Sequence, residues 1–360
     1  MNIDELLSRQ PYDLPRNQKE EMLETELQRL ISHHTANCPE YQSILAALGT
    51  TFNTQYAVEE IPFLPVRLFK HHQLKSVPDE QIQKILTSSG TTGQQVSRIY
   101  LDKETAVLQS KTLTNIVKSY IGSKRLPMIL VDSAGVIKNK QSFSARGAGL
   151  LGLMIFGRDH FYLLDEDMQI RWDALEQFLS EHAGEPILLF GFTFMVWQFL
   201  YQESVKRGMK LDLDNGILIH SGGWKKLLDM AVSNDIFKER LRAQLGIQRI
   251  YNFYGMVEQV GAIFMECEQG HLHAPNFADV IVRDMVTLQP VSFGQRGIIQ
   301  VLSVLPRSYP GHSLLTEDLG VVLGEDDCSC GRCGKYFRID GRIPAAELRG
   351  CSDTYAYDQR

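Results

Sequence analysis

The chain has 360 residues, of which 44% are hydrophobic and 22% are charged, and its formal net charge is -6. This length exceeds that of one typical domain, so we expect at least two lobes around an extensive core. An ordinary hydrophobic content argues against a disordered chain. The negative charge lacks the basic excess that binds a phosphate backbone, so nucleic acid is not an expected partner.

Helical patterns dominate residues 1–80. The N-terminus carries Asp4 and Glu5 where a signal peptide would carry positive charge, and no apolar segment follows it, so we expect a cytoplasmic protein. Hydrophobic residues at helical spacing form one stripe, which we interpret as core: Met22, Leu23, Leu27, Leu30 and Ile31. Pro62 and Pro65 interrupt the helical pattern and predict an extended segment over residues 61–70.

Strand-like and helix-like segments alternate between residues 81 and 279. The expected strands cover residues 128–131, 151–156, 187–190, 216–219 and 249–253. The expected helices include residues 171–182 and 229–245. This alternation predicts an α/β nucleotide-binding body made of parallel βαβ units. The longest uncharged segment, residues 186–202, is too short and too polar for a membrane span.

The sequence pattern changes after residue 279. Residues 280–342 show short strands separated by turns, as in Gly297–Ser303, and predict a small antiparallel β lobe. Residues 343–360 are expected to form a mobile C-terminal tail that carries Cys351.

The segment Leu86–Gly93 places glycines and hydroxyl side chains between two strand-like ranges. Gly90 and Gly93 permit turns that bring backbone N–H groups close to phosphate oxygens. Hydroxyl donors come from Ser88, Ser89, Thr91 and Thr92. Neither a P-loop nor a dinucleotide motif is present. We interpret the segment as a site for a nucleoside triphosphate, and the alternative is a polar loop that only joins two strands.

Three further polar motifs follow in the chain. Ser221–Gly223 comes directly after a strand-like segment, and Tyr254–Glu258 ends another. The second motif places a carboxylate at the carboxyl end of a strand, where α/β folds bind their ligands. Thr316–Asp318 supplies acidic groups suited to the paired hydroxyls of ribose.

This series of motifs resembles the acyl-adenylate-forming superfamily, and within it the branch of phenylacetate-CoA ligases and bioluminescence acyl-protein synthetases. The resemblance covers nearly the whole chain. It implies the large N-terminal body of the acyl-adenylate-forming fold, with ATP and Mg²⁺ as cofactors and a carboxylic acid, expected to be a fatty acid, as substrate.

The resemblance also implies roles for particular residues. Ser88–Gly93 would wrap the ATP phosphates, Glu258 would hold Mg²⁺, and Asp318 would bind the ribose. Arg342 matches the arginine that follows the ribose site. The residues expected to border the adenine are Ser221, Gly222, Gly223, Tyr251, Asn252, Tyr254 and Gly255.

Two departures from the superfamily concern its lysines. Val96 stands where many relatives have a lysine after the phosphate loop. Relatives also continue beyond the Gly-Arg pair into a mobile lid domain that carries a catalytic lysine, whereas this chain ends eighteen residues after Arg342. We therefore expect the lid domain to be absent, with Lys225, Lys226 or a partner protein as its replacement.

Cys351 is the expected acceptor of the acyl group. Nine residues separate it from Arg342, which is a reach of about 30 Å at ~3.3 Å per residue. Arg349 favours the thiolate that attacks an acyl adenylate. The arrangement is similar to acyl-protein synthetases, in which a cysteine near the C-terminus carries the acyl group to a reductase partner. Without this resemblance, we would interpret Cys351 as a free thiol in a frayed C-terminal tail.

Cysteine and histidine also gather in two segments, residues 267–273 and 328–333. Thiolate and imidazole ligands are typical of closed structural zinc sites. The set we choose is similar to one in the phenylacetate-CoA ligase branch: Cys267, His273, Cys328 and Cys330. Cys333 and His271 are alternatives for one of these ligands. The alternative to a metal site is a group of free, partly buried thiols.

The acyl pocket is expected near Phe190–Trp197 and Met154–Phe156, although aromatic residues at helical spacing are also typical of a core. Two other functions stay open. The first is an acyl-CoA ligase of the phenylacetate type, and the second is a zinc-stabilised interaction subunit without catalytic activity.

Overall fold

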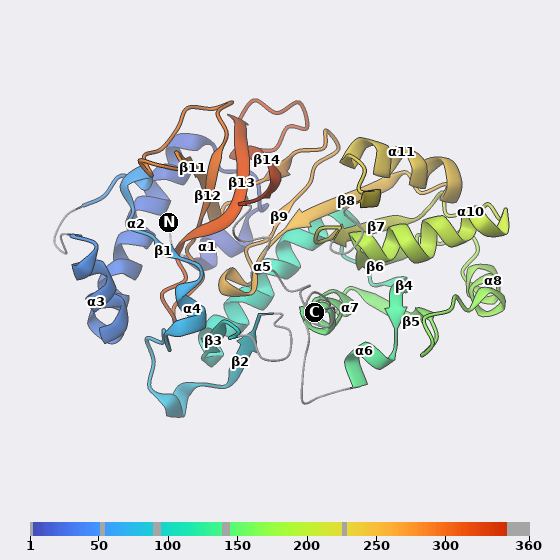
Figure 1. Ribbon diagram of the computed structural model, residues 1–360, viewed down its shortest axis with the longest axis horizontal. Coiled ribbons are helices and arrows are strands. Elements are labelled where there is room, and N and C mark those ends of the chain that lie inside the picture. Colours follow the sequence, from blue (N-terminus) through green and yellow to red (C-terminus); the bar gives the residue numbers. More distant parts are fainter. Residues whose placement is uncertain (1–2, 51–54, 89–94, 139–144, 225–228, 344–360) are drawn as a thin grey trace, which may run out of the picture. The chain divides into compact units, whose positions relative to one another are not determined.

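The computed structural model describes residues 3–50, 55–88, 95–138, 145–224 and 229–343. The chain forms two compact units, one made of residues 1–120 and 255–360 and the other of residues 121–254 (Figure 1). The body expected over residues 81–279 is therefore shared between the two units. Each unit is described separately.

Helices begin the first unit. They are α1 (Ile3–Ser8), α2 (Arg16–Asn37), α3 (Pro39–Ala47) and the short α4 (Leu68–His71). All members of the predicted hydrophobic stripe of α2 are buried, so its interpretation as core is confirmed. The segment expected to be extended contains β1 (Leu64–Pro65) and then turns into α4.

An antiparallel sheet forms the β lobe of the first unit. Its strands are β10 (Leu272–His273), β14 (Lys335–Arg342), β13 (Ser313–Glu325), β12 (Gly297–Ser303) and β11 (Ala278–Arg283), in this spatial order. Figure 1 shows β12, β13 and β14 side by side. The strand β1 adds to β13 in parallel. The antiparallel lobe predicted from the sequence is confirmed.

Five further elements belong to the first unit. The strands β2 (Lys84–Thr87) and β3 (Arg98–Leu101) form a hairpin. Helix α5 (Lys103–Ile121) follows the hairpin. The single-turn helix η5 (Val257–Gln259) and strand β9 (Phe264–Met265) come after the second unit in the sequence.

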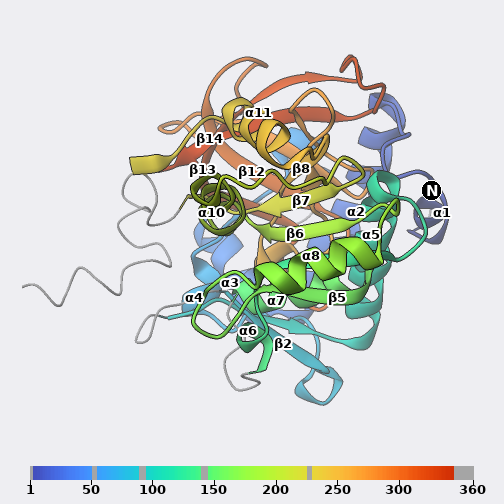
Figure 2. The same cartoon turned by 90° about the vertical axis from the view of Figure 1, so that its right-hand side faces the viewer.

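A parallel sheet is the centre of the second unit. Its spatial order is β5 (Gly157–Leu164), β4 (Leu126–Ser133), β6 (Leu188–Phe192), β7 (Ile217–Ser221) and β8 (Arg249–Tyr254). Every one of these neighbouring pairs is parallel, which confirms the predicted βαβ units. Figure 2 shows β6, β7 and β8 in succession.

Helices cover the sheet of the second unit. One face packs on α8 (Trp172–Glu181) and α11 (Asn234–Leu245), where alternate strand residues such as Val131, Leu189 and Leu218 enter one hydrophobic core. Helix α6 (Gly135–Lys138) follows β4. After β6 the chain forms α9 (Thr193–Met195), the π-helix η3 (Val196–Gln202) and α10 (Glu203–Arg207).

The prediction of a strand over residues 151–156 is wrong. Helix α7 (Ala145–Met154) occupies most of this range, and the strand β5 begins only at Gly157. Leu150 and Leu153 are buried while Leu151 and Ile155 are exposed, as a helical period requires. A short apolar run does not distinguish a buried strand from a helix by periodicity alone.

Across the residues that the structure describes, no helix combines the length and the apolar character that crossing a membrane requires.

Candidate active site

The strands on either side of the predicted phosphate loop pair in the β2–β3 hairpin. The backbone N–H of Ser88 donates to the carbonyl of Ser97 (3.1 Å), and the N–H of Ser97 donates to Ser88 Oγ (2.9 Å). Ser89, Gly90, Thr91, Thr92 and Gly93 lie outside the described residues. Ser88, where the loop begins, is therefore bonded to Ser97, which lies beyond its far end.

Glu258 is a buried carboxyl group in η5, with an exposed fraction of 7%. Burial raises its pKa, because an apolar environment disfavours the charged form. The Ser97 hydroxyl, the Lys70 ammonium and the Arg342 guanidinium act in the opposite direction and favour the carboxylate. Ser97, Lys70 of α4 and Arg342 of β14 therefore all act on this one acidic side chain.

The acidic residues of β13 lie beside basic ones. Asp318 stands opposite Arg342 on β14, with Arg342 Nε 3.3 Å from Asp318 Oδ1. Arg67 Nη2 lies 2.7 Å from Glu317 Oε1. The first unit thus pairs two predicted site residues, Asp318 and Arg342, and the charge of Arg342 also acts on a third, Glu258.

Arg67 and Lys70 were not predicted as part of this group. Both come from the segment that the prolines at 62 and 65 define, and their basic side chains were the signal that could have identified them. An interaction between residue 70 and residue 258 depends on the tertiary fold, so the sequence pattern alone did not place them there.

In the second unit, the residues expected near adenine lie at the carboxyl ends of two neighbouring parallel strands. Ser221 ends β7, and its Oγ donates to the carbonyl of Phe253 in β8 (2.9 Å). Gly222 has φ +79°, which favours glycine. Tyr251 and Asn252 lie within β8 and Tyr254 ends it, whereas Gly255 belongs to the first unit. This edge of a parallel sheet is where α/β folds bind ligands.

The proposed acyl-pocket segment is mostly core. Phe190, Met195, Val196 and Trp197 are buried. Phe192 and Phe194 keep partial exposure. These two rings also pack against the hydrophobic core of the second unit.

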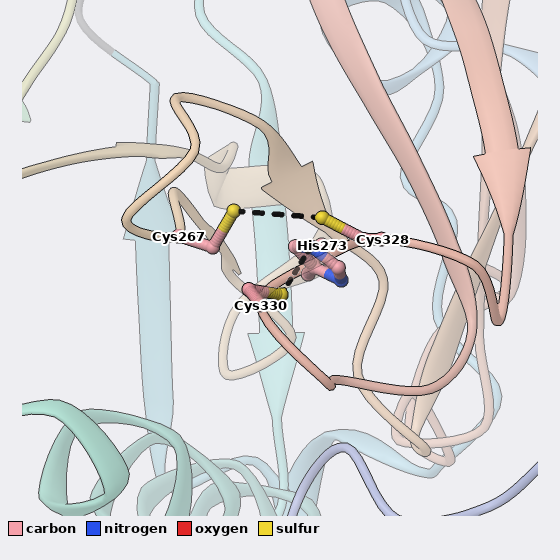
Figure 3. A group of neighbouring side chains, drawn as sticks. All are labelled: Cys267, His273, Cys328 and Cys330. Atoms are coloured by element: carbon pink, nitrogen blue, oxygen red, sulfur yellow. Dashed lines mark hydrogen bonds between the residues drawn. The ribbon is translucent and has the colours of Figure 1, made fainter.

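The four residues chosen as metal ligands form one group in the first unit (Figure 3). Their ligand atoms all lie within 4.8 Å of one another. Cys267 Sγ is 4.0 Å from Cys328 Sγ, and Cys330 Sγ is 3.3 Å from His273 Nε2. Sulfur ligands of a tetrahedral zinc ion, each at about 2.3 Å, lie about 3.8 Å apart. The donor set and its spacing therefore fit a tetrahedral ion.

Two tight turns present the cysteines. Cys267 and Cys328 each accept, at their carbonyl, the N–H of a glycine three residues later (3.0 Å), Gly270 and Gly331. Both glycines have positive φ. His273 comes from β10, which pairs with β14. Short local turns and one strand pair thus bring together two segments that are distant in sequence.

The two alternative metal ligands, His271 and Cys333, differ in position. His271 Nδ1 lies 3.5 Å from Cys328 Sγ, beside the group. Cys333 is not a member of the group, and its N–H donates to the carbonyl of Tyr12. Arg332, which the sequence did not single out, pairs with Glu268 and lies over the ring of Tyr120.

Cys351, Lys225 and Lys226 lie outside the described residues, so the structure does not place them.

The fold is similar to that of 2-hydroxyisobutyryl-CoA ligase, solved in an open conformation in complex with 2-HIB-AMP and CoA. The TM-score is 0.71 at 17% sequence identity, over 94% of this chain and 72% of that one. The chain thus has the fold of the acyl-adenylate-forming ligases.

The sequence comparisons identify the family. The family model described as "Acyl-protein synthetase, LuxE" matches residues 1–358, so the chain belongs to this family of acyl-protein synthetases. It is 22% identical over 330 residues to a long-chain-fatty-acid–luciferin-component ligase of Vibrio harveyi, covering 89% of this chain and 83% of that protein. It is 24% identical over 277 residues to the protein of the same name from Aliivibrio fischeri, covering 74% and 70%.

Proposed function

We propose that this chain activates a fatty acid with ATP to form acyl-AMP and pyrophosphate, and then transfers the acyl group to its own Cys351. The observation that carries the proposal is the buried Glu258, whose ionised form is favoured by the charges of Lys70 and Arg342. Joining a carboxylate to the α-phosphate brings anions together, so cationic groups at this point lower the barrier.

The residues take the roles that this chemistry requires. Glu258 supplies an oxygen ligand for Mg²⁺, which offsets the repulsion between anions and stabilises the leaving pyrophosphate. Ser88–Gly93 bind the phosphates, and Asp318, oriented by Arg342 at 3.3 Å, binds the ribose. The adenine lies against Ser221–Gly223 and the Tyr251–Gly255 segment.

The second step moves the acyl group to sulfur. The Cys351 thiolate attacks the acyl carbonyl, the bond from that carbon to the phosphate oxygen breaks, and AMP leaves with the electron pair. The product is a thioester. A fatty acid substrate and a protein acceptor are supported by the relatives' name, long-chain-fatty-acid–luciferin-component ligase. An acyl reductase is the partner that would collect the acyl group, in the cytoplasm.

The intact-protein mass after incubation with palmitate, ATP and Mg²⁺ tests this function. We expect the mass to increase by one palmitoyl group, without CoA, and hydroxylamine to reverse the increase because it cleaves thioesters. An acyl-CoA ligase would instead leave the protein mass unchanged and produce palmitoyl-CoA when CoA is added. A non-catalytic interaction subunit would do neither.

We also propose a structural zinc ion held by Cys267, His273, Cys328 and Cys330. The spacing of their ligand atoms within 4.8 Å supports it. The ion would join the turn after β9 to the turn between β13 and β14, which the Arg332–Glu268 ion pair also links. A closed four-ligand site favours a structural role over a catalytic one.

Removal of this ion is expected to destabilise the protein. Protein purified without chelator should contain one zinc per chain, and stripping the metal should lower Tm by about 5 °C or more. Cys328→Ser should lose the zinc, while Cys333→Ser should retain it, since Cys333 lies outside the group. Elemental analysis and thermal melts measure both quantities. A zinc content well below one per chain in the wild type would contradict the proposal.

A further inference from the structure

Hydrogen bonds link the carboxyl ends of three strands in the second unit. Thr193 is the first residue after β6, and its Oγ1 donates to the carbonyl of Ser221 (3.2 Å). The same oxygen lies 3.0 Å from Nδ1 of His220. Ser221 Oγ in turn donates to the carbonyl of Phe253 (2.9 Å). The ends of β6, β7 and β8 are therefore tied together at Ser221.

The direction of these bonds assigns the proton on His220. A threonine hydroxyl has one hydrogen, and here it is donated to the Ser221 carbonyl. Thr193 Oγ1 therefore accepts a hydrogen bond from Nδ1–H of His220. This histidine is 1% exposed and packs on Phe237, with ring centroids 4.7 Å apart. Burial lowers the pKa of His220 to about 3, so the ring stays neutral and continues to donate.

Phe192, the residue before Thr193, packs closely against Gly222 of the turn. A Cβ atom at Gly222 would lie 3.1 Å from the ring of Phe192, so the backbone there approaches the ring closely. Phe192 and Thr193 thus both contact the Ser221–Gly222 turn, one through its ring and one through a hydrogen bond. The chain then enters the π-helix Val196–Gln202, a rare form that is frequent at functional sites.

We propose that Thr193, oriented by His220, is a positioning residue that holds the Ser221–Gly223 turn in the shape that receives the adenine of ATP. The inference rests on the proposed function, which places this turn beside the adenine. A turn that is ordered before ATP binds loses less conformational entropy on binding. Because Thr193 orders this turn, it raises the affinity for ATP. It does not touch the reacting atoms, and the rate of the chemical step should not depend on it.

Thr193→Val tests the inference, because valine keeps the shape of the side chain and removes the hydroxyl. We expect Kd for ATP·Mg²⁺, measured by isothermal titration calorimetry, to rise about three- to tenfold, the effect of one lost hydrogen bond. KM for ATP in palmitate-dependent ATP–pyrophosphate exchange should rise equally, with kcat within about twofold of wild type. Thr193→Ser, which restores the hydroxyl, should return both values to those of the wild type.

Thr112→Val is the matched control. Thr112 is a buried threonine of α5, and its hydroxyl has no hydrogen-bond partner within the described part of the chain. The same chemical change there should leave Kd for ATP unaltered.

Three results would overturn the inference. The first is a Thr193→Val variant that binds ATP as tightly as the wild type. The second is a fall in kcat at unchanged Kd. The third applies if Thr193→Val melts below the assay temperature: a folded Thr193→Ser variant with weakened ATP binding would then show that the hydroxyl is not what matters. A wild-type protein that binds no ATP overturns the proposed function itself, which is a distinguishable outcome.

Discussion

Cys351→Ser is expected to abolish acylation of the protein by palmitate and ATP while leaving palmitate-dependent ATP–pyrophosphate exchange within about twofold of wild type. The thiolate is the nucleophile of the second step only, and a serine hydroxyl is a far weaker nucleophile at neutral pH. Formation of acyl-AMP precedes this step and does not use the thiol. Intact-protein mass measures the first quantity, and exchange of labelled pyrophosphate into ATP measures the second.

Cys38→Ser is the control for this experiment. Cys38 is buried at the N-cap of α3, a position that accepts serine well. This variant should be acylated like the wild type. A hydroxylamine-labile palmitoyl group that persists in Cys351→Ser would place the acyl group on another thiol.

Glu258→Gln is expected to reduce ATP–pyrophosphate exchange about 100-fold or more, as the loss of one charge-stabilising group in an active site does. Glutamine keeps the size of the side chain and removes the negative charge that would bind Mg²⁺. The adenylation step therefore loses the cation that offsets repulsion between the carboxylate and the phosphates. Steady-state exchange rates at saturating ATP, palmitate and Mg²⁺ measure this loss.

The thermal stability of Glu258→Gln should not fall with its activity. Burial raises the pKa of Glu258, so the folded protein binds a proton more tightly there than the unfolded chain does. This group stabilises the fold below its unfolded pKa, and the stabilisation is lost as pH rises through the folded pKa. At neutral pH the neutral glutamine should leave Tm unchanged or raise it. Adenylation by the wild type should fall as pH falls through the raised pKa of Glu258, because the protonated group does not bind Mg²⁺.

Glu325→Gln is the matched control for Glu258→Gln. Glu325 is the last residue of β13, and burial raises its carboxyl pKa too. It lies near Lys335 and Arg16, away from the residues assigned to ATP. Exchange activity should survive this change. Full activity in Glu258→Gln would contradict the assigned role of Glu258.

The sequence was sufficient to predict β4, β6, β7 and β8 of the parallel sheet, because apolar runs bounded by turns and separated by helical patterns have few other solutions. It failed at residues 151–156, where Leu151 and Ile155 continue an apolar run that belongs to the helix α7. There the sequence contained no period of two. The exposed sides of that helix became visible only once its packing was known.

The sequence by itself determined the residue types of the site and their order: hydroxyls and glycines at 88–93, the turn at 221–223, Glu258, Asp318, Arg342 and the cysteines and histidines of the metal group. Only the tertiary structure decided what surrounds them. It decided that the charge of Lys70 acts on Glu258, that Arg332 interacts with Cys330 of the metal group, and that Thr193 donates a hydrogen bond to the Ser221 carbonyl. These contacts join residues separated by up to about two hundred positions, and packing of whole elements determines them. Local residue patterns report which chemistry is present, and the fold determines where each charge and hydrogen bond acts.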